Sequence, residues 1–308
     1  MTTPLQSRLL GLKAQISTIV VGKPAQIDDA LACLLAGGHL LIEDVPGVGK
    51  TTLAHVLAVS LGLKFSRVQF TADLMPSDLV GVSVYERARE AFVFHPGPVF
   101  AQVLLADEIN RAGPKTQSAL LEAMEEQQAT VDGETRSLPQ PFFVIATQNP
   151  GDQLGTYPLP ESQLDRFLMC ITLGYPDARS ERALLSGQDR REALARLGPV
   201  MTPAELLEAM AGVRRIHASE PLLDYLKALI AASRSGQWFV EGLSPRAGIG
   251  VLRLARARAL LAERDFVSPD DVQAILPQAI AHRLIAVAGA GRGRREQVRA
   301  MIESVPLP

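Results

Sequence analysis

A lysine followed by two threonines marks the stretch of this chain with the clearest chemistry. In Leu40–Leu53 an apolar run ends in a glycine-containing turn, after which Lys50 and Thr51 open a helical stretch. A triphosphate needs such a turn, because clustered backbone N–H groups and the positive end of a helix bind anions. The lysine then reaches the β- and γ-phosphates, and the threonine hydroxyl binds Mg²⁺. The predicted phosphate-binding residues are Pro46, Gly47, Val48, Gly49, Lys50, Thr51 and Thr52.

One position departs from the general form of this loop. The pattern G-x-x-x-x-G-K-[ST] has a glycine where this chain has Asp44, so only the half ending in Gly49, Lys50 and Thr51 matches strictly. The alternative is a strand-to-helix turn that binds nothing. The apolar run before the loop and the helical pattern after it are the context that phosphate binding requires, and they favour the binding loop.

Two consecutive carboxylates form a second candidate site. Asp107 and Glu108 follow Val103–Ala106, a short apolar run typical of a strand buried on both faces. Because adjacent side chains of an extended chain point in opposite directions, we expect the two to have different roles. Asp107 is predicted to contact the nucleotide and coordinate Mg²⁺, and Glu108 to activate the attacking water.

Two further segments are expected to complete the site. The apolar run Phe142–Ala146 is followed by Asn149, and the carboxyl ends of parallel strands are where open sheets bind ligands. Asn149 is therefore predicted to orient the attacking water, with a turn-forming Asn-Pro as the alternative. Val21 and Gly22 lie in a turn between two helical patterns. They are candidates for holding the adenine base, with a plain helix connector as the other interpretation.

The order of apolar patterns predicts the fold class. Apolar strands alternate with helical periodicity up to position 176, and only amphipathic helical segments follow. We predict an α/β, three-layer α/β/α core of the P-loop NTPase type with a parallel sheet in residues 1–176, and a small all-helical lid in residues 177–308. Two hairpins are expected as insertions, near residues 81–100 and 129–138. The aromatic residues Tyr85, Phe92 and Phe94 of the first hairpin either contact a partner or pack beneath it.

Composition excludes several classes of protein. The 308 residues carry a net charge of -2, so nothing draws the whole chain to nucleic acid or an anionic membrane. The longest apolar run, Ala30–Ile42, is too short to cross a bilayer. Cys33 and Cys170 lie in apolar runs and are expected to be buried thiols. The first residues lack the pattern of a secretory signal, and we expect a cytoplasmic protein.

The motifs taken together resemble one family. The segments EDVPGVGKT, LLADEINRA, ATQNP, LPESQLDRF and SPRAG occur in the order and at the intervals of the MoxR family of AAA+ ATPases, and the likeness covers nearly the whole chain. Asp44 matches this family's form of the loop. The resemblance implies that Asn149 is sensor 1 and that Arg166 is an arginine finger reaching a neighbouring subunit's γ-phosphate. It also implies that Arg246, in the lid, is sensor 2. The alternative role for both arginines is a surface ion pair.

The resemblance also implies a function. Such proteins hydrolyse ATP with Mg²⁺, and we expect a homo-oligomeric ring, most simply a hexamer. The ring would remodel or activate a protein client as a chaperone, with a von Willebrand factor A-domain partner on another chain. Three alternatives stay open: a metal-chelatase-like motor, a motor acting on nucleic acid, and a nucleotide-gated scaffold without turnover.

Overall fold

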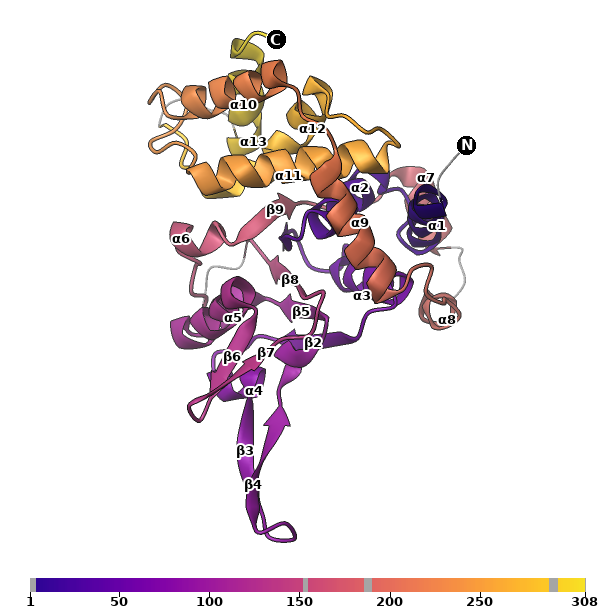
Figure 1. Cartoon of the computed structure of the whole chain (residues 1–308), viewed down its shortest axis with the longest axis vertical. Coiled ribbons are helices and arrows are strands. Elements are labelled where there is room, and N and C mark those ends of the chain that lie inside the picture. Colours follow the sequence, from indigo (N-terminus) through magenta and orange to yellow (C-terminus); the bar gives the residue numbers. More distant parts are fainter. Residues whose placement is uncertain (1–3, 152–154, 186–189, 288–292, 308) are drawn as a thin grey trace.

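Five parallel strands form the centre of the molecule. The structure is a computed structural model that describes residues 4–151, 155–185, 190–287 and 293–307. The strand order in the sheet is β2-β5-β8-β1-β9, and every neighbouring pair is parallel (Figure 1). The α/β fold class with a parallel sheet is thereby confirmed. The strands are β1 (His39–Glu43), β2 (Phe65–Gln69), β5 (Val103–Asp107), β8 (Phe143–Gln148) and β9 (Phe167–Ile171).

Helices cover both faces of this sheet. Successive residues of a strand point to opposite faces, and so Leu40 and Ile42 join one hydrophobic cluster while Leu41 joins the other. All five residues of β5 and of β9 are buried, as a sheet covered on both sides requires. The first cluster contains residues of α1 (Pro4–Ile19), α2 (Pro24–Leu35) and α3 (Lys50–Ser60), and the second contains residues of α4 (Pro76–Val80) and α5 (Pro114–Glu126).

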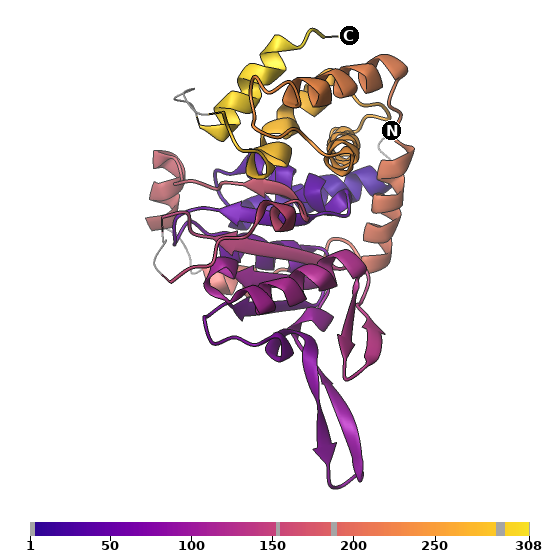
Figure 2. The ribbon, with the colours of Figure 1, turned by 90° about the vertical axis from the view of Figure 1, so that its left-hand side faces the viewer.

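Two hairpins form separate two-stranded sheets outside the central sheet. β3 (Gly81–Glu86) and β4 (Ala91–Pro96) form a long antiparallel ribbon that projects from the body (Figures 1 and 2). Tyr85 and Phe92 are exposed on it and contact each other edge to face, whereas Phe94 packs against Phe100 and the guanidinium of Arg136. The second hairpin, β6 (Gln128–Val131) and β7 (Glu134–Ser137), turns at two positive-φ residues, as two-residue hairpin loops prefer.

The remaining chain is helical. Three of its helices, α10 (Glu220–Ser233), α11 (Pro245–Leu261) and α12 (Pro269–Ile280), begin after a serine whose hydroxyl accepts a hydrogen bond from a backbone N–H of the first turn. A proline stands one or two positions after each serine. Both features are strong signals for the start of a helix. The elements are α6 (Glu161–Leu164), α7 (Ala178–Leu185), α8 (Arg190–Ala195), α9 (Pro203–Arg215), α10 (Glu220–Ser233), α11 (Pro245–Leu261), α12 (Pro269–Ile280) and α13 (Arg294–Ser304), with short 3₁₀ turns at Pro98–Phe100, Ile109–Arg111 and Ala281–Arg283.

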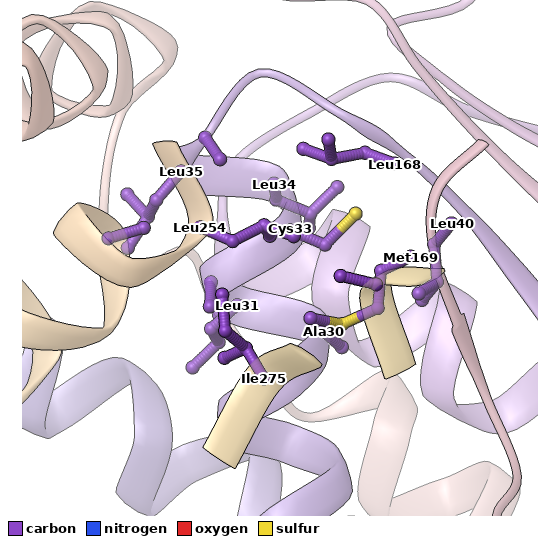
Figure 3. Packing of buried hydrophobic residues seen from close by; sticks show 14 of the residues in the cluster. Ala30, Leu31, Cys33, Leu34, Leu35, Leu40, Leu168, Met169, Leu254 and Ile275 are labelled. Atoms are coloured by element: carbon purple, nitrogen blue, oxygen red, sulfur yellow. The ribbon is translucent and has the colours of Figure 1, made fainter. Parts of the chain in front are cut away.

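Helix α2 joins the helical part to the sheet. Figure 3 shows its buried residues between Leu254 and Ile275 of the lid helices on one side and Leu40 and Met169 of the sheet on the other. All belong to one continuous hydrophobic cluster. The lid therefore packs on α2 and the β9 side of the sheet, and the division of the chain at residues 176 and 177 stays a prediction.

The structure also answers two smaller questions. Cys33 and Cys170 are buried free thiols, and burial raises the pKa of each thiol above its usual range. Within the described residues, no helix is long and apolar enough to cross a membrane.

Candidate functional site

The carboxyl ends of three neighbouring strands meet at one edge of the sheet, where parallel sheets bind ligands. Strand β1 leads into the glycine loop, β5 ends at Asp107 and β8 ends at Gln148. A cavity of about 370 Å³, here called the Lys50 cavity, lies at this edge. Its lining is Pro46, Gly47, Gly49, Lys50, Thr51, Thr52, Arg67, Gln69, Asp107, Glu108 and Asn149.

The glycine loop is shaped for close approach of a ligand. Gly47 and Gly49 have φ values of 85° and 96°, a conformation that favours glycine. Apart from the adjacent residues of the chain, no atom lies within 4 Å of the place where a Cβ would stand on either glycine, so both backbones face open space. Helix α3 begins directly after Gly49, and the unpaired N–H groups and positive dipole end of a helix start favour binding of an anion there.

Asp44 explains the departure from the general loop pattern. Its side chain is buried and accepts two backbone N–H groups, from Val45 at 2.8 Å and from Gly174 at 2.6 Å. Gly174 follows β9, so this carboxylate fastens the loop to the neighbouring strand of the sheet. Both oxygens of the Asp44 carboxylate thus accept hydrogen bonds from the protein itself, and these bonds hold the loop at the end of β1.

Lys50 is folded onto the loop that precedes it. Its Nζ donates to the Asp44 carbonyl at 2.6 Å and lies 3.4 Å from the Gln148 carbonyl. Partial burial lowers the pKa of this lysine below its usual value, and the carboxylates of Asp44, Asp107 and Glu108 oppose that shift. A bound phosphate would oppose it in the same way, which makes the ammonium a fitting partner for an anion.

Asp107 is held by two residues that the sequence did not single out. Its Oδ1 accepts the hydroxyl of Thr147 at 2.6 Å, and its Oδ2 accepts from Arg67 Nη2 at 2.7 Å. Thr147 Oγ1 also accepts the backbone N–H of Glu108 at 2.9 Å, and so fixes both acidic positions. In the sequence, Arg67 could be noticed only as a single arginine within the alternating strand β2. Its contact with Asp107 follows from the pairing of β2 with β5, which the sequence does not show.

The donor set fits a magnesium ion. Mg²⁺ takes hard oxygen ligands and is held through one or two carboxylates together with substrate phosphates. Thr51 and Asp107 supply a hydroxyl and a carboxylate in the Lys50 cavity. Among the residues that the structure describes, no group of three or more His, Cys, Asp or Glu side chains could enclose a metal ion. A metal that arrives with a nucleotide suits this arrangement.

Glu108 diverges from Asp107 for a reason other than the expected one. We predicted that the alternation of an extended strand would separate the two carboxylates. Strand β5 ends at Asp107, and Glu108 has a φ of 56°, in the left-handed region. Its Oε2 forms an ion pair with Arg111 Nε at 2.6 Å. The two carboxylates therefore have separate partners, Arg67 and Thr147 for Asp107 and Arg111 for Glu108.

A second cavity adjoins the first. This Val21 cavity, also about 370 Å³, shares Gly47, Gly49 and Thr52 with the Lys50 cavity. Gly22 lies in the same turn as Val21, has a φ of 74°, and packs so closely on α7 that an added Cβ would lie 2.2 Å from Ser180 Oγ. The lining of the Val21 cavity is Ile19, Val20, Val21, Lys23, Gly47, Val48, Gly49, Thr52, Tyr175, Pro176 and Glu181.

The two predicted arginines lie elsewhere. Arg166 precedes β9, at the amino edge of the sheet, and forms an ion pair with Glu125 Oε2 at 2.8 Å. Arg246 binds Glu125 Oε1, also at 2.8 Å. The Lys50 cavity lies at the carboxyl edge, which five-residue strands place about 16 Å away. The structure brings Arg166 and Arg246 to each other and not to this subunit's glycine loop, and their roles in hydrolysis stay predictions.

Comparisons with known proteins define the class of this fold and site. The model of the ATPase family associated with various cellular activities (AAA) matches residues 39–169, and that of the AAA lid domain matches residues 232–304. A crystal structure of a protein from Cytophaga hutchinsonii, assigned as an ATPase, superposes with a TM-score of 0.89 at 36% identity and covers 99% of this chain and 96% of that one. The protein is an AAA+ ATPase that binds and hydrolyses ATP.

Relatives then identify the family. The chain is 44% identical over 304 residues to the uncharacterized protein YeaC of Bacillus subtilis, covering 97% of this chain and 95% of the relative. It is 40% identical over 280 residues to Chaperone MoxR1 of Mycobacterium tuberculosis, covering 88% and 74%. It is also 31% identical over 331 residues to Protein MoxR of Paracoccus denitrificans, covering 98% and 97%. The chain belongs to the MoxR family of AAA+ ATPases, which confirms the resemblance of its motifs.

Proposed function

We propose that this ATPase works as a ring in which each active site lies between two copies of the chain. One observation carries the proposal. Arg166 and Arg246 lie together at the amino edge of the sheet, whereas the glycine loop lies at the carboxyl edge. Arginines that serve hydrolysis from this position must act on a nucleotide held by a neighbouring subunit. A closed ring, most simply a hexamer, provides such a neighbour for every copy.

Within one site, the nucleotide-holding subunit supplies most of the groups. Lys50 and the start of α3 bind the β- and γ-phosphates, and the Val21 cavity receives the base. Thr51 and Asp107 would hold Mg²⁺, which neutralises charge on the phosphates when bound. Glu108 takes a proton from the attacking water, and Asn149 orients that water as sensor 1. Arg166 of the next subunit stabilises the charge that develops on the γ-phosphate, with Arg246 beside it.

The ring's work is assigned to protein clients. MoxR1 of Mycobacterium tuberculosis is named a chaperone, and we extend that role to this chain. The net charge of -2 supports a protein client over nucleic acid. We include a von Willebrand factor A-domain protein as the partner that delivers the client. Stimulation of the ATPase by such a protein supports this assignment, and stimulation by DNA contradicts it.

Mixing experiments test whether the sites are shared. Arg166→Ala should leave nucleotide binding unchanged and lower turnover by about 10³- to 10⁵-fold, as loss of an arginine finger does. When the variant is added to wild-type protein at rising ratios, the ATPase rate should fall by more than dilution predicts. The rate per subunit of wild-type protein should also rise with protein concentration.

Arg196→Ala is the matched control. Arg196 also forms an ion pair with a glutamate, Glu192, but at an exposed position where such pairs contribute little. It should behave as wild type in every mixture. A specific activity that depends neither on concentration nor on the fraction of Arg166→Ala would reject a site shared between subunits.

A further inference from the structure

Glu125, in the last turn of α5, is the meeting point of the two arginines. Each of its carboxylate oxygens accepts from a different guanidinium, Oε2 from Arg166 and Oε1 from Arg246, both at 2.8 Å. Arg166 adjoins the sheet and Arg246 opens the lid helix α11, so one carboxylate joins three separate elements. The hydrogen bond from Arg246 and the charge of Arg166 hold the pKa of Glu125 below its usual value. The side chain is therefore ionised at neutral pH.

Few carboxylates lie near Arg166 and Arg246 among the described residues. A cavity of about 200 Å³ at this edge contains four arginines, and its acidic lining residues are Glu125 and Asp165. Arg283 takes Asp165, at 2.6 Å. Arg166 and Arg246 both contact the one Glu125 carboxylate, and two positive charges placed so close together repel each other unless an anion lies between them. In the described part of the chain, Glu125 is the carboxylate that keeps them side by side.

The ion pairs with Glu125 leave most N–H donors of both arginines available. A guanidinium has five N–H donors, and the carboxylate takes one from each. About 29% of the Arg166 side chain and 57% of the Arg246 side chain are exposed. Both arginines thus present further donors to the solvent at the surface of the subunit.

We propose that Glu125 is a positioning residue that holds Arg166 and Arg246 together for the γ-phosphate of a nucleotide bound by a neighbouring copy. This inference rests on the shared site proposed above. It assigns Glu125 to the subunit that donates the arginines, and predicts no role for it in the subunit that binds the nucleotide. A residue needed only for folding would matter equally in both subunits.

Complementation between two inactive variants separates these cases. Glu108→Gln subunits keep their arginines but lack the catalytic base, and Arg166→Ala/Arg246→Ala subunits keep the base but lack the arginines. Their mixture should hydrolyse ATP, because arginines of the first serve sites of the second. Adding Glu125→Ala to the Glu108→Gln subunit should lower this rate about 10- to 100-fold, since small misplacements of reacting groups have effects of that size. Adding it to the double-arginine variant should change the rate by less than about twofold.

Two controls make the result specific. Glu126→Ala removes a neighbouring exposed glutamate for which the structure gives no ion pair in the described residues, and should have no effect on either side. Glu125→Gln can accept from one arginine through its amide oxygen and should give an intermediate loss on the donor side. Glu125→Ala on the nucleotide-binding side serves as the test of folding.

Each contrary outcome has a distinct meaning. If the parent mixture is inactive, the shared site is wrong, and the positioning role falls with it. If the parent mixture is active but Glu125→Ala has no effect on the donor side, raises the rate there, or lowers it equally on both sides, the positioning role alone is rejected.

Discussion

At the scale of single residues, the charged side chains of the Lys50 cavity are already paired with groups of the protein. Lys50 binds a backbone carbonyl, Asp107 binds Arg67, and Glu108 binds Arg111. Partners of this kind keep polar groups satisfied until the ligand arrives. Under the proposed mechanism, the carboxylate that acts as the base, Glu108, is the one that forms the ion pair with Arg111.

Replacing Glu108 tests its role directly. Glu108→Gln keeps the size of the side chain but cannot accept the proton of the attacking water. Turnover should fall about 10²- to 10⁴-fold, the usual contribution of a general base, while ATP affinity changes little because Lys50 and α3 are intact. The measurements are steady-state phosphate release and titration with a fluorescent ATP analogue. Glu122→Gln, on the exposed side of α5, is the control, and normal turnover in Glu108→Gln would rule out the assigned base.

At the scale of elements, the turn between α1 and α2 connects packing to binding. Val21 lines the second cavity, and the adjacent Gly22 packs against Ser180 of α7. The turn cannot move toward the cavity or away from it without disturbing α7. The shape of the Val21 cavity is therefore set by helix packing as much as by its own lining.

A pair of glycine substitutions separates these effects. Gly22→Ala places a Cβ 2.2 Å from Ser180 Oγ at a φ of 74°, so the turn must shift. It should cost about 1–3 kcal/mol of stability and weaken nucleotide binding. Gly133→Ala, in the turn of the second hairpin, has a similar φ of 79° but open space around the added Cβ. It should destabilise the fold slightly and leave binding unchanged. Denaturation curves and nucleotide titrations measure both, and unchanged affinity in a destabilised Gly22→Ala would contradict the link.

At the scale of the whole molecule, α2 carries the lid on the sheet. Its residue Asp29 is buried and accepts from Gln278 of α12 at 3.3 Å. Burial raises the pKa of Asp29 from 3.8 to about 6, against the opposing charge of Arg258 in α11. The junction between sheet and lid thus contains an ionised carboxylate at neutral pH that burial disfavours. The long β3–β4 hairpin projects at the end of the molecule opposite the lid (Figure 1).

Asp29→Asn should stabilise the protein in a pH-dependent way. Because the folded pKa of Asp29 lies above the unfolded one, the folded state binds more protons between pH 3.8 and about 6, and wild-type stability falls as pH rises through this window. Asparagine does not titrate. Its advantage should be near zero at about pH 4 and grow to roughly 3 kcal/mol above pH 7. Urea unfolding of both proteins at the two pH values measures it, and an advantage that is equal at both, or larger in acid, would refute the assignment.

The local pattern of the chain determined most of the elements and much of the site. Three features depend on residues within a few positions of one another: the glycine loop before α3, the carboxylates at the end of β5 and the serine and proline residues at helix starts. Their roles can therefore be predicted from the sequence before the fold is known. The parallel ends of β1, β5 and β8 could be expected to bring Lys50, Asp107 and Asn149 to one edge, and the Lys50 cavity contains all three.

Only the tertiary structure decided which side chains meet across elements. The contact of Arg67 with Asp107 spans 40 residues, and that of Arg246 with Glu125 spans 121. Such pairs follow from the strand order β2-β5-β8-β1-β9 and from the packing of the lid on α2, neither of which runs in the order of the chain. Periodicity and motif spacing describe each element alone. The pairing of Arg166 and Arg246 with the same carboxylate, Glu125, arises from long-range packing that no local pattern encodes.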